Sequence, residues 1–292
     1  MSNIFLQTTF LERFQEYQVP IGDWFAAFID WLTDTFNAQF DAIRSGISWL
    51  VELLADVLGL FPFWALALVI AVLAWRLAGR GEAIFAFLGV LLIANIGLWP
   101  ATVSTLALII TATLIALLIG VPLGILGAKF GPVNTVLRPL LDLMQTMPAF
   151  VYLIPAVFFF RIGAVPAVFA TIIFAMPPAI RLTSLGIRQV PQELIEAGEA
   201  FGSNWYQLLF KVQLPQALPT IMAGINQCIM LSLSMVVIAS MIGAGGLGSV
   251  VLTGIDRLNV GMGFEGGLAV VIIAIILDRL TQGKGSSKGY RN

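Results

Sequence analysis

The residues best suited to do chemistry lie between Glu193 and Pro219, in the longest polar interruption between strongly apolar segments. Glu193, Glu196 and Glu199 fall on one side of a helix at 100° per residue. Carboxylates near the start of a helix also suit the positive end of its dipole. This acidic face is a candidate for holding contact with another molecule.

The same segment is predicted to contain two short helices. Gly202 is expected to end the first, and Ser203 or Asn204 to cap a second helix over residues 205–211. Pro215 and Pro219 then open the next apolar segment.

Catalytic chemistry has few candidates elsewhere. The chain has no His, and its one cysteine, Cys228, lies in an apolar segment, so neither a disulfide within the chain nor a His/Cys metal site is expected. No nucleophile–base pair is visible, and the glycine-rich run at 242–249 lacks the phosphate-loop pattern. We therefore expect no enzymatic activity, no catalytic residue and no bound cofactor, and we interpret 242–249 as a compact turn outside the membrane with close backbone packing.

The composition is that of a multi-pass membrane protein. Of 292 residues, 59% are hydrophobic and 11% charged, against roughly 45–50% and 25% in a soluble domain. Mean hydropathy is +0.96. Residues 1–60 hold eight acidic and two basic side chains, which argues against nucleic-acid binding.

The pattern of apolar residues predicts an all-α fold with about seven spans. Apolar residues recur every three or four positions from Trp24 to Leu54, which predicts an amphipathic helix, or two with a break near Ser45 and Gly46. Gly120 and Gly124 have the spacing that permits close helix approach. The spans are expected at 61–77, 83–99, 103–128, 140–160, 164–180, 218–242 and 267–277. The expected organisation is a leader (1–20), the amphipathic scaffold (21–59), a transmembrane domain (60–282) with a polar loop (191–215), and a tail (283–292).

Lysine and arginine predict the orientation. With the N-terminus outside and the C-terminus in the cytoplasm, eleven basic residues lie inside and four outside. The inner set is Arg76, Arg80, Lys129, Arg138, Arg181, Arg188, Lys211, Arg279, Lys284, Lys288 and Arg291, and the outer set is Arg13, Arg44, Arg161 and Arg257. The polar loop is then cytoplasmic.

The expected spans contain almost no charge, which disfavours an ion-coupled secondary transporter. Asp142 is the nearest exception, and its expected place is the cytoplasmic boundary. Polar residues of the sixth span either hydrogen-bond helices together or line a pore, and the sequence leaves both open; they are Asn226, Gln227, Ser232 and Ser234.

The polar loop resembles the EAA motif of the membrane subunits of ATP-binding-cassette (ABC) importers. The matching residues are Glu196, Ala197, Gly198, Gly202, Val212, Leu214 and Pro215. Gly198 stands where the motif has alanine, and Val212 where it has isoleucine. The resemblance implies a coupling helix that sits in a cleft of the ATPase subunit. Glu196 would hold its register, and small residues at 197, 198 and 200 would enter the cleft.

A second resemblance covers residues 60–280. The run from Asp142 to Pro155, the run IFAMPP at 173–178, GINQ at 224–227 and GAGGLG at 243–248 are similar to permeases of glycine betaine/proline betaine/choline importers. The resemblance implies a type I importer in a bacterial inner or cytoplasmic membrane. Its partners would be a second permease copy, two ATPase subunits that bind ATP and Mg²⁺, an external binding protein, and lipid. The implied physiology is osmotic uptake.

The sequence indicates the residues of the transport path less specifically than those of the polar loop. A quaternary ammonium is recognised by aromatic faces, yet all seven tryptophans lie outside spans three to seven. Candidate path or gate residues are Met144, Met147, Pro148, Phe150, Tyr152, Asn226, Gln227, Ser232 and Ser234. The alternatives are an ABC permease for another small solute and an ion-coupled secondary transporter.

Overall fold

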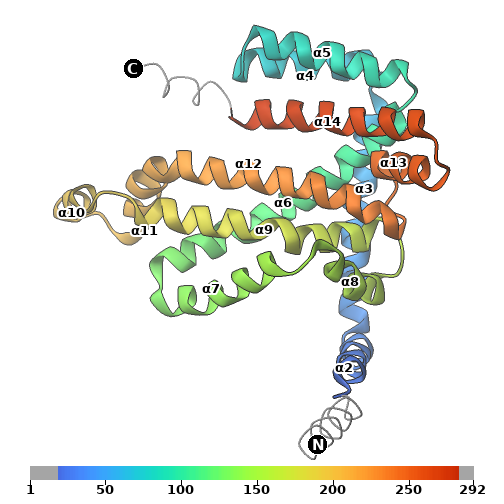
Figure 1. Ribbon diagram of the computed structural model, residues 1–292. Coiled ribbons are helices and arrows are strands. Elements are labelled where there is room, and N and C mark those ends of the chain that lie inside the picture. The colour runs from blue at the N-terminus through green and yellow to red at the C-terminus, as the bar shows by residue number, and fades with distance from the viewer. Residues whose placement is uncertain (1–18, 283–292) are drawn as a thin grey trace, which may run out of the picture. The chain divides into compact units, whose positions relative to one another are not determined.

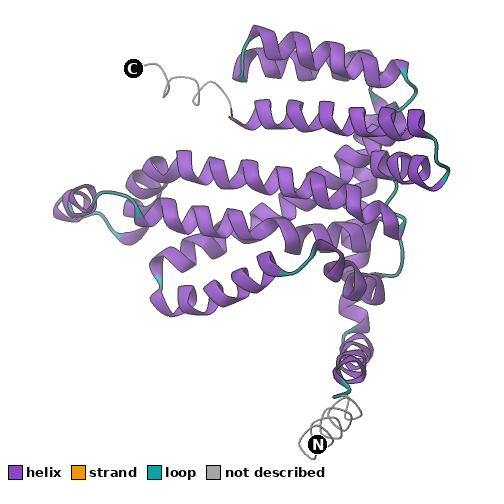
Figure 2. Cartoon of the chain, in the orientation of Figure 1, coloured by secondary structure: helices purple, strands orange, loops and turns teal. Residues whose placement is uncertain are grey.

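A computed structural model describes residues 19–282, and every regular element in that range is a helix (Figures 1 and 2). The expected tail and nearly all of the expected leader lie outside the described residues. In chain order the elements are α2 (Ile21–Thr35), α3 (Asn37–Leu60), α4 (Phe63–Leu77), α5 (Arg80–Asn95), α6 (Trp99–Lys129), α7 (Gly131–Thr146), η1 (Ala149–Tyr152), α8 (Leu153–Phe160), α9 (Ala164–Arg188), α10 (Gln192–Ala200), α11 (Trp205–Leu208), η2 (Leu209–Gln213), α12 (Leu214–Ala239), η3 (Ser240–Ile242), α13 (Gly246–Asp256) and α14 (Val260–Gln282).

The chain divides into two compact units, one up to Ala42 and one from Ile43. The described part of the first unit holds α2 and the start of α3. Most of α2 is exposed, including Trp24 and Trp31. The amphipathic segment is broken at Phe36, and the break expected near Ser45 and Gly46 is wrong: α3 passes through both. A single glycine costs a helix only about 1 kcal/mol, too little to end it.

The second unit is built around α6, α9 and α12, which pack closely through small residues. A Cβ atom at Gly124 would lie 2.6 Å from Thr183 Cβ and 2.7 Å from the Ile180 carbonyl oxygen. One at Gly224 of α12 would lie 3.1 Å from the Pro178 carbonyl oxygen. Glycine therefore lets both α6 and α12 approach the backbone of α9, as the spacing of Gly120 and Gly124 predicted.

Helix lengths support fewer spans than the seven expected. Four helical stretches are long and apolar enough to cross a membrane: Trp99–Lys129, Ala164–Arg188, Trp205–Ile242 and Val260–Gln282. Two bent pairs bring the number to six at most: Asn37–Leu60 with Phe63–Leu77, bent by 99°, and Gly131–Thr146 with Ala149–Phe160, bent by 109°. At 16 residues, α5 is shorter than a typical span.

The expected continuous span over 140–160 is wrong because the chain turns at Met147 and Pro148. The residue before a proline avoids helical geometry. Met147 accordingly has an extended backbone, with ψ 135°, and α7 ends at Thr146. The prolines at 177 and 178 do not break α9, which continues to Arg188.

The glycine-rich run forms the compact turn that the sequence predicted, followed by the short helix α13, which was not foreseen. Gly243, Gly245 and Gly246 have φ between 73° and 79°, a region that glycine occupies without strain. A Cβ atom at Gly246 would lie 2.4 Å from Thr105 Oγ1, which also accepts a 2.8 Å hydrogen bond from the Leu247 N–H. The turn is thus held against α6.

Several connections of the second unit meet at the same end of its helices. The α4–α5 and α6–α7 turns, the α10–α11 loop and the C-terminal end of α14 lie at one end of the packed helices, on the left in Figure 1. Basic residues mark this end: Arg76 and Arg80 flank the α4–α5 turn, and Lys129, Arg188 and Arg279 lie in the last turns of α6, α9 and α14. We call it the basic end.

The first prediction concerns the packing of α6 on α9. Gly124→Ala places a methyl group against the backbone of α9 and should destabilise the protein by about 1–3 kcal/mol. Gly81→Ala is the control, because no atom lies within 4 Å of a Cβ there. Thermal unfolding in detergent measures both, and equal midpoints would contradict the role of Gly124.

Candidate functional site

The polar loop at the basic end forms the first expected helix as α10, whereas the second, expected over 205–211, is α11 only to Leu208 and continues as η2 into α12. Pro191 precedes α10, and Glu193 lies in its first turn. Glu193, Glu196 and Glu199 are all exposed. Glu196 makes no ion pair or hydrogen bond with any residue that the structure describes. The acidic face of α10 is therefore open for contact with another molecule.

Gly202, whose backbone has the left-handed conformation, ends α10, as predicted. Gly202 has φ +77°; its N–H bonds to the Glu199 carbonyl at 2.8 Å, and the Ser203 N–H bonds to the Gly198 carbonyl at 3.1 Å. This pair of bonds satisfies carbonyls that the helix end leaves free. Asn204, one of the two expected caps, exchanges hydrogen bonds with Gln207 at the start of α11. The turn between the two helices is thus fixed at both ends.

Gly198 does not lie on the outer side of α10, where the cleft-entering residues were expected. A Cβ atom there would lie 2.8 Å from Leu208 Cδ1 and 3.8 Å from Val212 Cγ2. Gly198 therefore lies where α10 packs on the following helical segment. Ala197 and Ala200 are exposed and remain available on the outer surface.

The loop is anchored to two membrane helices. After α11 the chain continues without a break through the π-helical turn η2 into α12, where Leu214 N–H bonds to Leu209 O, five residues back. Leu209 packs in a buried cluster with Ile187 of α9 and with Ala217 and Ile221 of α12. Leu214 packs on this cluster, and Pro215, at the start of α12, is exposed. The loop is therefore packed against both α9 and α12.

A cation–π contact ties the loop to α6 as well. Lys129 Nζ lies 3.4 Å from the centre of the Trp205 ring and 4.9 Å from that of Phe130. Such contacts contribute about 0.5–2 kcal/mol, more where water is excluded. Sequence reasoning missed this contact, because nothing in the sequence pairs residues 76 positions apart.

The candidate path residues are spread over two places, and several of them bond helices together. Met147 and Pro148 form the break of the fourth apolar segment, beside exposed Phe150. The Tyr152 hydroxyl donates to the Met144 carbonyl at 2.6 Å and so holds α7 to η1 across that break. These residues shape the bend.

Among the candidate residues on α12, Asn226 supports the interpretation that these polar side chains hydrogen-bond helices together. Asn226 donates to Asp278 Oδ1 of α14 at 3.1 Å and accepts from the Thr281 hydroxyl. Ser234 bonds only to the Met230 carbonyl of its own helix. Of the remaining two, Gln227 is exposed and Ser232 is buried. Asp278 was missed, although it is one of two charged residues near the end of the last apolar segment.

The chain matches the model of the family described as "Binding-protein-dependent transport system inner membrane component" over residues 120–282. The chain belongs to this permease family. The matched residues run from the second half of α6 to the end of α14, and they include the bend, the polar loop and the α12–α14 contact.

Several curated permease proteins are similar over most of this chain. The glycine betaine transport system permease protein OpuAB of Bacillus subtilis is 53% identical, covering 91% of this chain and 94% of its own. The glycine betaine/proline betaine transport system permease protein ProW of Escherichia coli is 49% identical, covering 96% and 79%. The glycine betaine/carnitine transport permease protein GbuB of Listeria monocytogenes is 52% identical, covering 90% and 95%.

The fold of the permease family is also found among solved structures. An inward-facing structure of the MetNI methionine ABC transporter matches with a TM-score of 0.54 at 22% identity, covering 59% of this chain and 87% of the matched chain. At that identity the likeness shows the fold alone. It is the transmembrane fold of an ABC importer.

The second prediction tests the anchor of the loop. Lys129→Met removes the cation over Trp205, so backbone amides of α10 and α11 should exchange hydrogen about 2- to 30-fold faster. Lys211→Met, an exposed lysine of η2, is the matched control and should leave exchange unchanged. Hydrogen exchange read by mass spectrometry measures both, and identical exchange in wild type and Lys129→Met would show that the contact does not hold the loop.

Proposed function

We propose that the chain is the membrane-spanning subunit of an ATP-driven importer for glycine betaine, proline betaine or a related quaternary-ammonium solute such as choline. Membership of the permease family supports the transport role. The printed names of three relatives at 49–53% identity, each of which includes glycine betaine, support the substrate class. The observation on which the proposal depends most is the exposed helix α10, fixed to the membrane helices by its neighbours.

The proposed partners follow from that helix. Two ATPase subunits, which bind ATP and Mg²⁺, would each receive α10 of one permease copy in a cleft. Glu196 and Ala197 would face the ATPase, and exposed apolar side chains would be buried on contact: Phe201 is 90% exposed and Leu194 39%. Exposed aromatic residues are typical anchors of protein interfaces. A second permease copy and an external binding protein complete the proposed importer.

The basic end is proposed to face the cytoplasm. The basic residues of the expected inner side that the structure describes lie in the helices and turns that meet there, and α10 lies there too (Figure 1). An excess of lysine and arginine is typical of cytoplasmic segments. This orientation brings α10 within reach of a cytoplasmic ATPase.

Force would pass from α10 to the transport path through packed helices. Closure of the ATPase pair would displace α10, and the Leu209 cluster would transmit the displacement to α9 and α12. Because α6 and α12 both contact the α9 backbone through glycines, the three helices would move as one body. The bend between α7 and α8 is the natural place for a gate, because its backbone is already free of helical geometry there.

The third prediction concerns Glu196. Glu196→Lys should leave folding almost unchanged because the side chain is exposed. It should weaken binding to the ATPase, since losing one partner of a buried charge pair costs about 2–5 kcal/mol, roughly thirtyfold or more in affinity. Co-purification of the ATPase and substrate-stimulated hydrolysis in lipid measure the effect.

Glu199→Lys is the control, because it makes the same charge change outside the motif positions and should have a milder effect. Full ATPase retention and normal stimulation in Glu196→Lys would refute the coupling role of Glu196.

The fourth prediction concerns transport itself. Membrane vesicles containing the full importer and its binding protein should take up glycine betaine only with ATP inside, and vanadate should abolish that uptake. Glycine betaine, proline betaine, choline and carnitine, tested in turn, identify the substrate. Uptake driven by an ion gradient without ATP would instead establish a secondary transporter, and uptake of an unrelated solute alone would exclude the proposed substrate class.

A further inference from the structure

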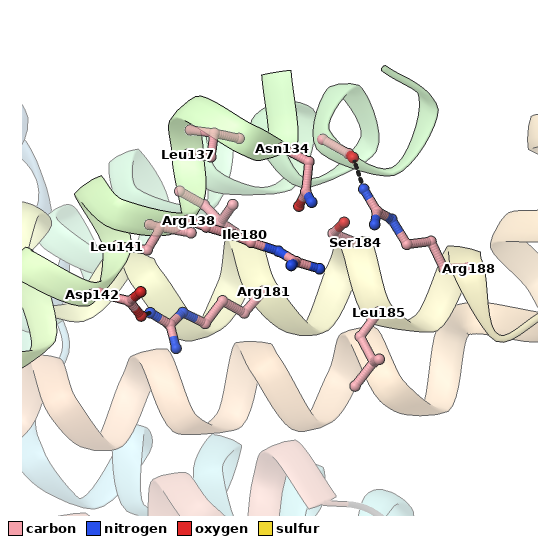
Figure 3. Close-up of a pocket in the computed structure, with 11 residues that line it drawn as sticks. Asn134, Leu137, Arg138, Leu141, Asp142, Ile180, Arg181, Ser184, Leu185 and Arg188 are labelled. Carbon is pink, nitrogen blue, oxygen red and sulfur yellow. Dashed lines mark hydrogen bonds and ion pairs between the residues drawn. The ribbon is translucent and has the colours of Figure 1, made fainter. Parts of the chain in front are cut away.

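A cavity lined by both apolar and charged residues lies between α6, α7 and α9 (Figure 3). Its volume is about 280 Å³. Gly127 and Ser184 contribute to its wall, and its charged residues come from two helices, with Arg138 and Asp142 on α7 and Arg181 and Arg188 on α9. None of these basic residues belongs to the coupling motif.

The cavity has an excess of positive charge. Asp142 is its one lining carboxylate, and it forms an ion pair with Arg181 at 2.5 Å. Arg188 donates to the Gly127 carbonyl in the last turn of α6, which is a neutral partner. Three guanidinium groups and one carboxylate leave a formal charge of +2 on the lining.

Holding the helices together does not require all three arginines. The Arg181–Asp142 pair joins α7 to α9, and Arg188 joins α9 to α6. Arg138 makes no ion pair or hydrogen bond with any residue in the range 19–282 that the structure describes, although a guanidinium group has five N–H donors. Figure 3 shows its side chain on the cavity side of α7, near Asn134, whose amide is a further potential donor.

Asn134 and the exposed side chain of Arg138 lie on the cavity side of α7, away from its exposed apolar residues. Asn134 and Arg138, one turn apart, line the cavity, whereas Val136, Leu140 and Leu143 on the opposite side are 49–61% exposed. An apolar outer side suits the hydrocarbon or a second chain. The unpartnered charge therefore faces a space that can hold a ligand.

We infer that this cavity binds a phosphate-class oxyanion, with Arg138 as the main ligand-binding side chain and Asn134 and Arg188 as supporting donors. A planar guanidinium fork matches two phosphate oxygens. The anion can be the phosphodiester of an acidic phospholipid, which basic pockets between membrane helices bind on the cytoplasmic side, or free inorganic phosphate.

The transported solute is a poorer match. A betaine has no net charge, so it would leave the +2 of the lining uncompensated. Among the described residues that line the cavity, none has an aromatic ring to receive a quaternary ammonium group.

The test uses the full chain in nanodiscs that contain phosphatidylcholine with a minority of phosphatidylglycerol. Native mass spectrometry measures how much phosphatidylglycerol is retained, and calorimetric titration with inorganic phosphate at constant ionic strength measures the free anion. Arg138→Gln should lower binding of the true ligand about tenfold or more. Arg138→Lys, which keeps the charge but loses the fork, should lie between it and wild type. Neither assay requires transport, so failure of the proposed import function would not affect them.

Arg76→Gln is the matched control, since it removes an exposed arginine at the same end but outside the cavity. Selective loss of phosphatidylglycerol in Arg138→Gln identifies the lipid as the source, and selective loss of phosphate binding identifies the free anion. The inference is overturned if wild type binds neither probe, if Arg138→Gln binds both as wild type does, or if Arg76→Gln loses as much as Arg138→Gln. Unchanged unfolding midpoints confirm that the variants are folded.

Discussion

The close approach of α6, α9 and α12 is the constraint on which the rest of the structure depends. Within a membrane the hydrophobic effect does not drive helices together, so association depends on packing and on interhelical hydrogen bonds. Gly124 and Gly224 supply that packing against the backbone of α9 from two sides. A larger residue at either contact would separate the helices and remove the firm base on which the polar loop stands.

The polar loop is attached to these packed helices. Its acidic face and its apolar side chains Leu194 and Phe201 are exposed, whereas its attachment is buried in the Leu209 cluster and covered by the Lys129–Trp205 contact. A rigid attachment and an open outer surface are what a transmitter between two subunits needs. The helical chain also continues from α11 through η2 into α12 without a loop.

Most polar side chains of the described helices bond to a carbonyl of their own helix, and a smaller set connects different helices. Tyr152 bridges the bend after α7, Asn226 connects α12 to Asp278 on α14, and Arg181 pairs with Asp142. In surroundings of low polarity such bonds are favoured because the alternative is an unsatisfied group. Arg138, a charged side chain without an ion pair or hydrogen bond in the described range, motivates the proposed anion site.

The sequence by itself determined the helical fold, the polar loop with its glycine turn at Gly202, and the family, because these depend on local periodicity, backbone conformation and short motifs. It also indicated the break in the amphipathic segment, but misplaced it. Tertiary structure alone decided which polar residues meet. The cation–π contact of Lys129 and the partners of Asn226 depend on how helices far apart in sequence pack, and the inward side of Gly198 depends on how α10 packs on the helical segment that follows it.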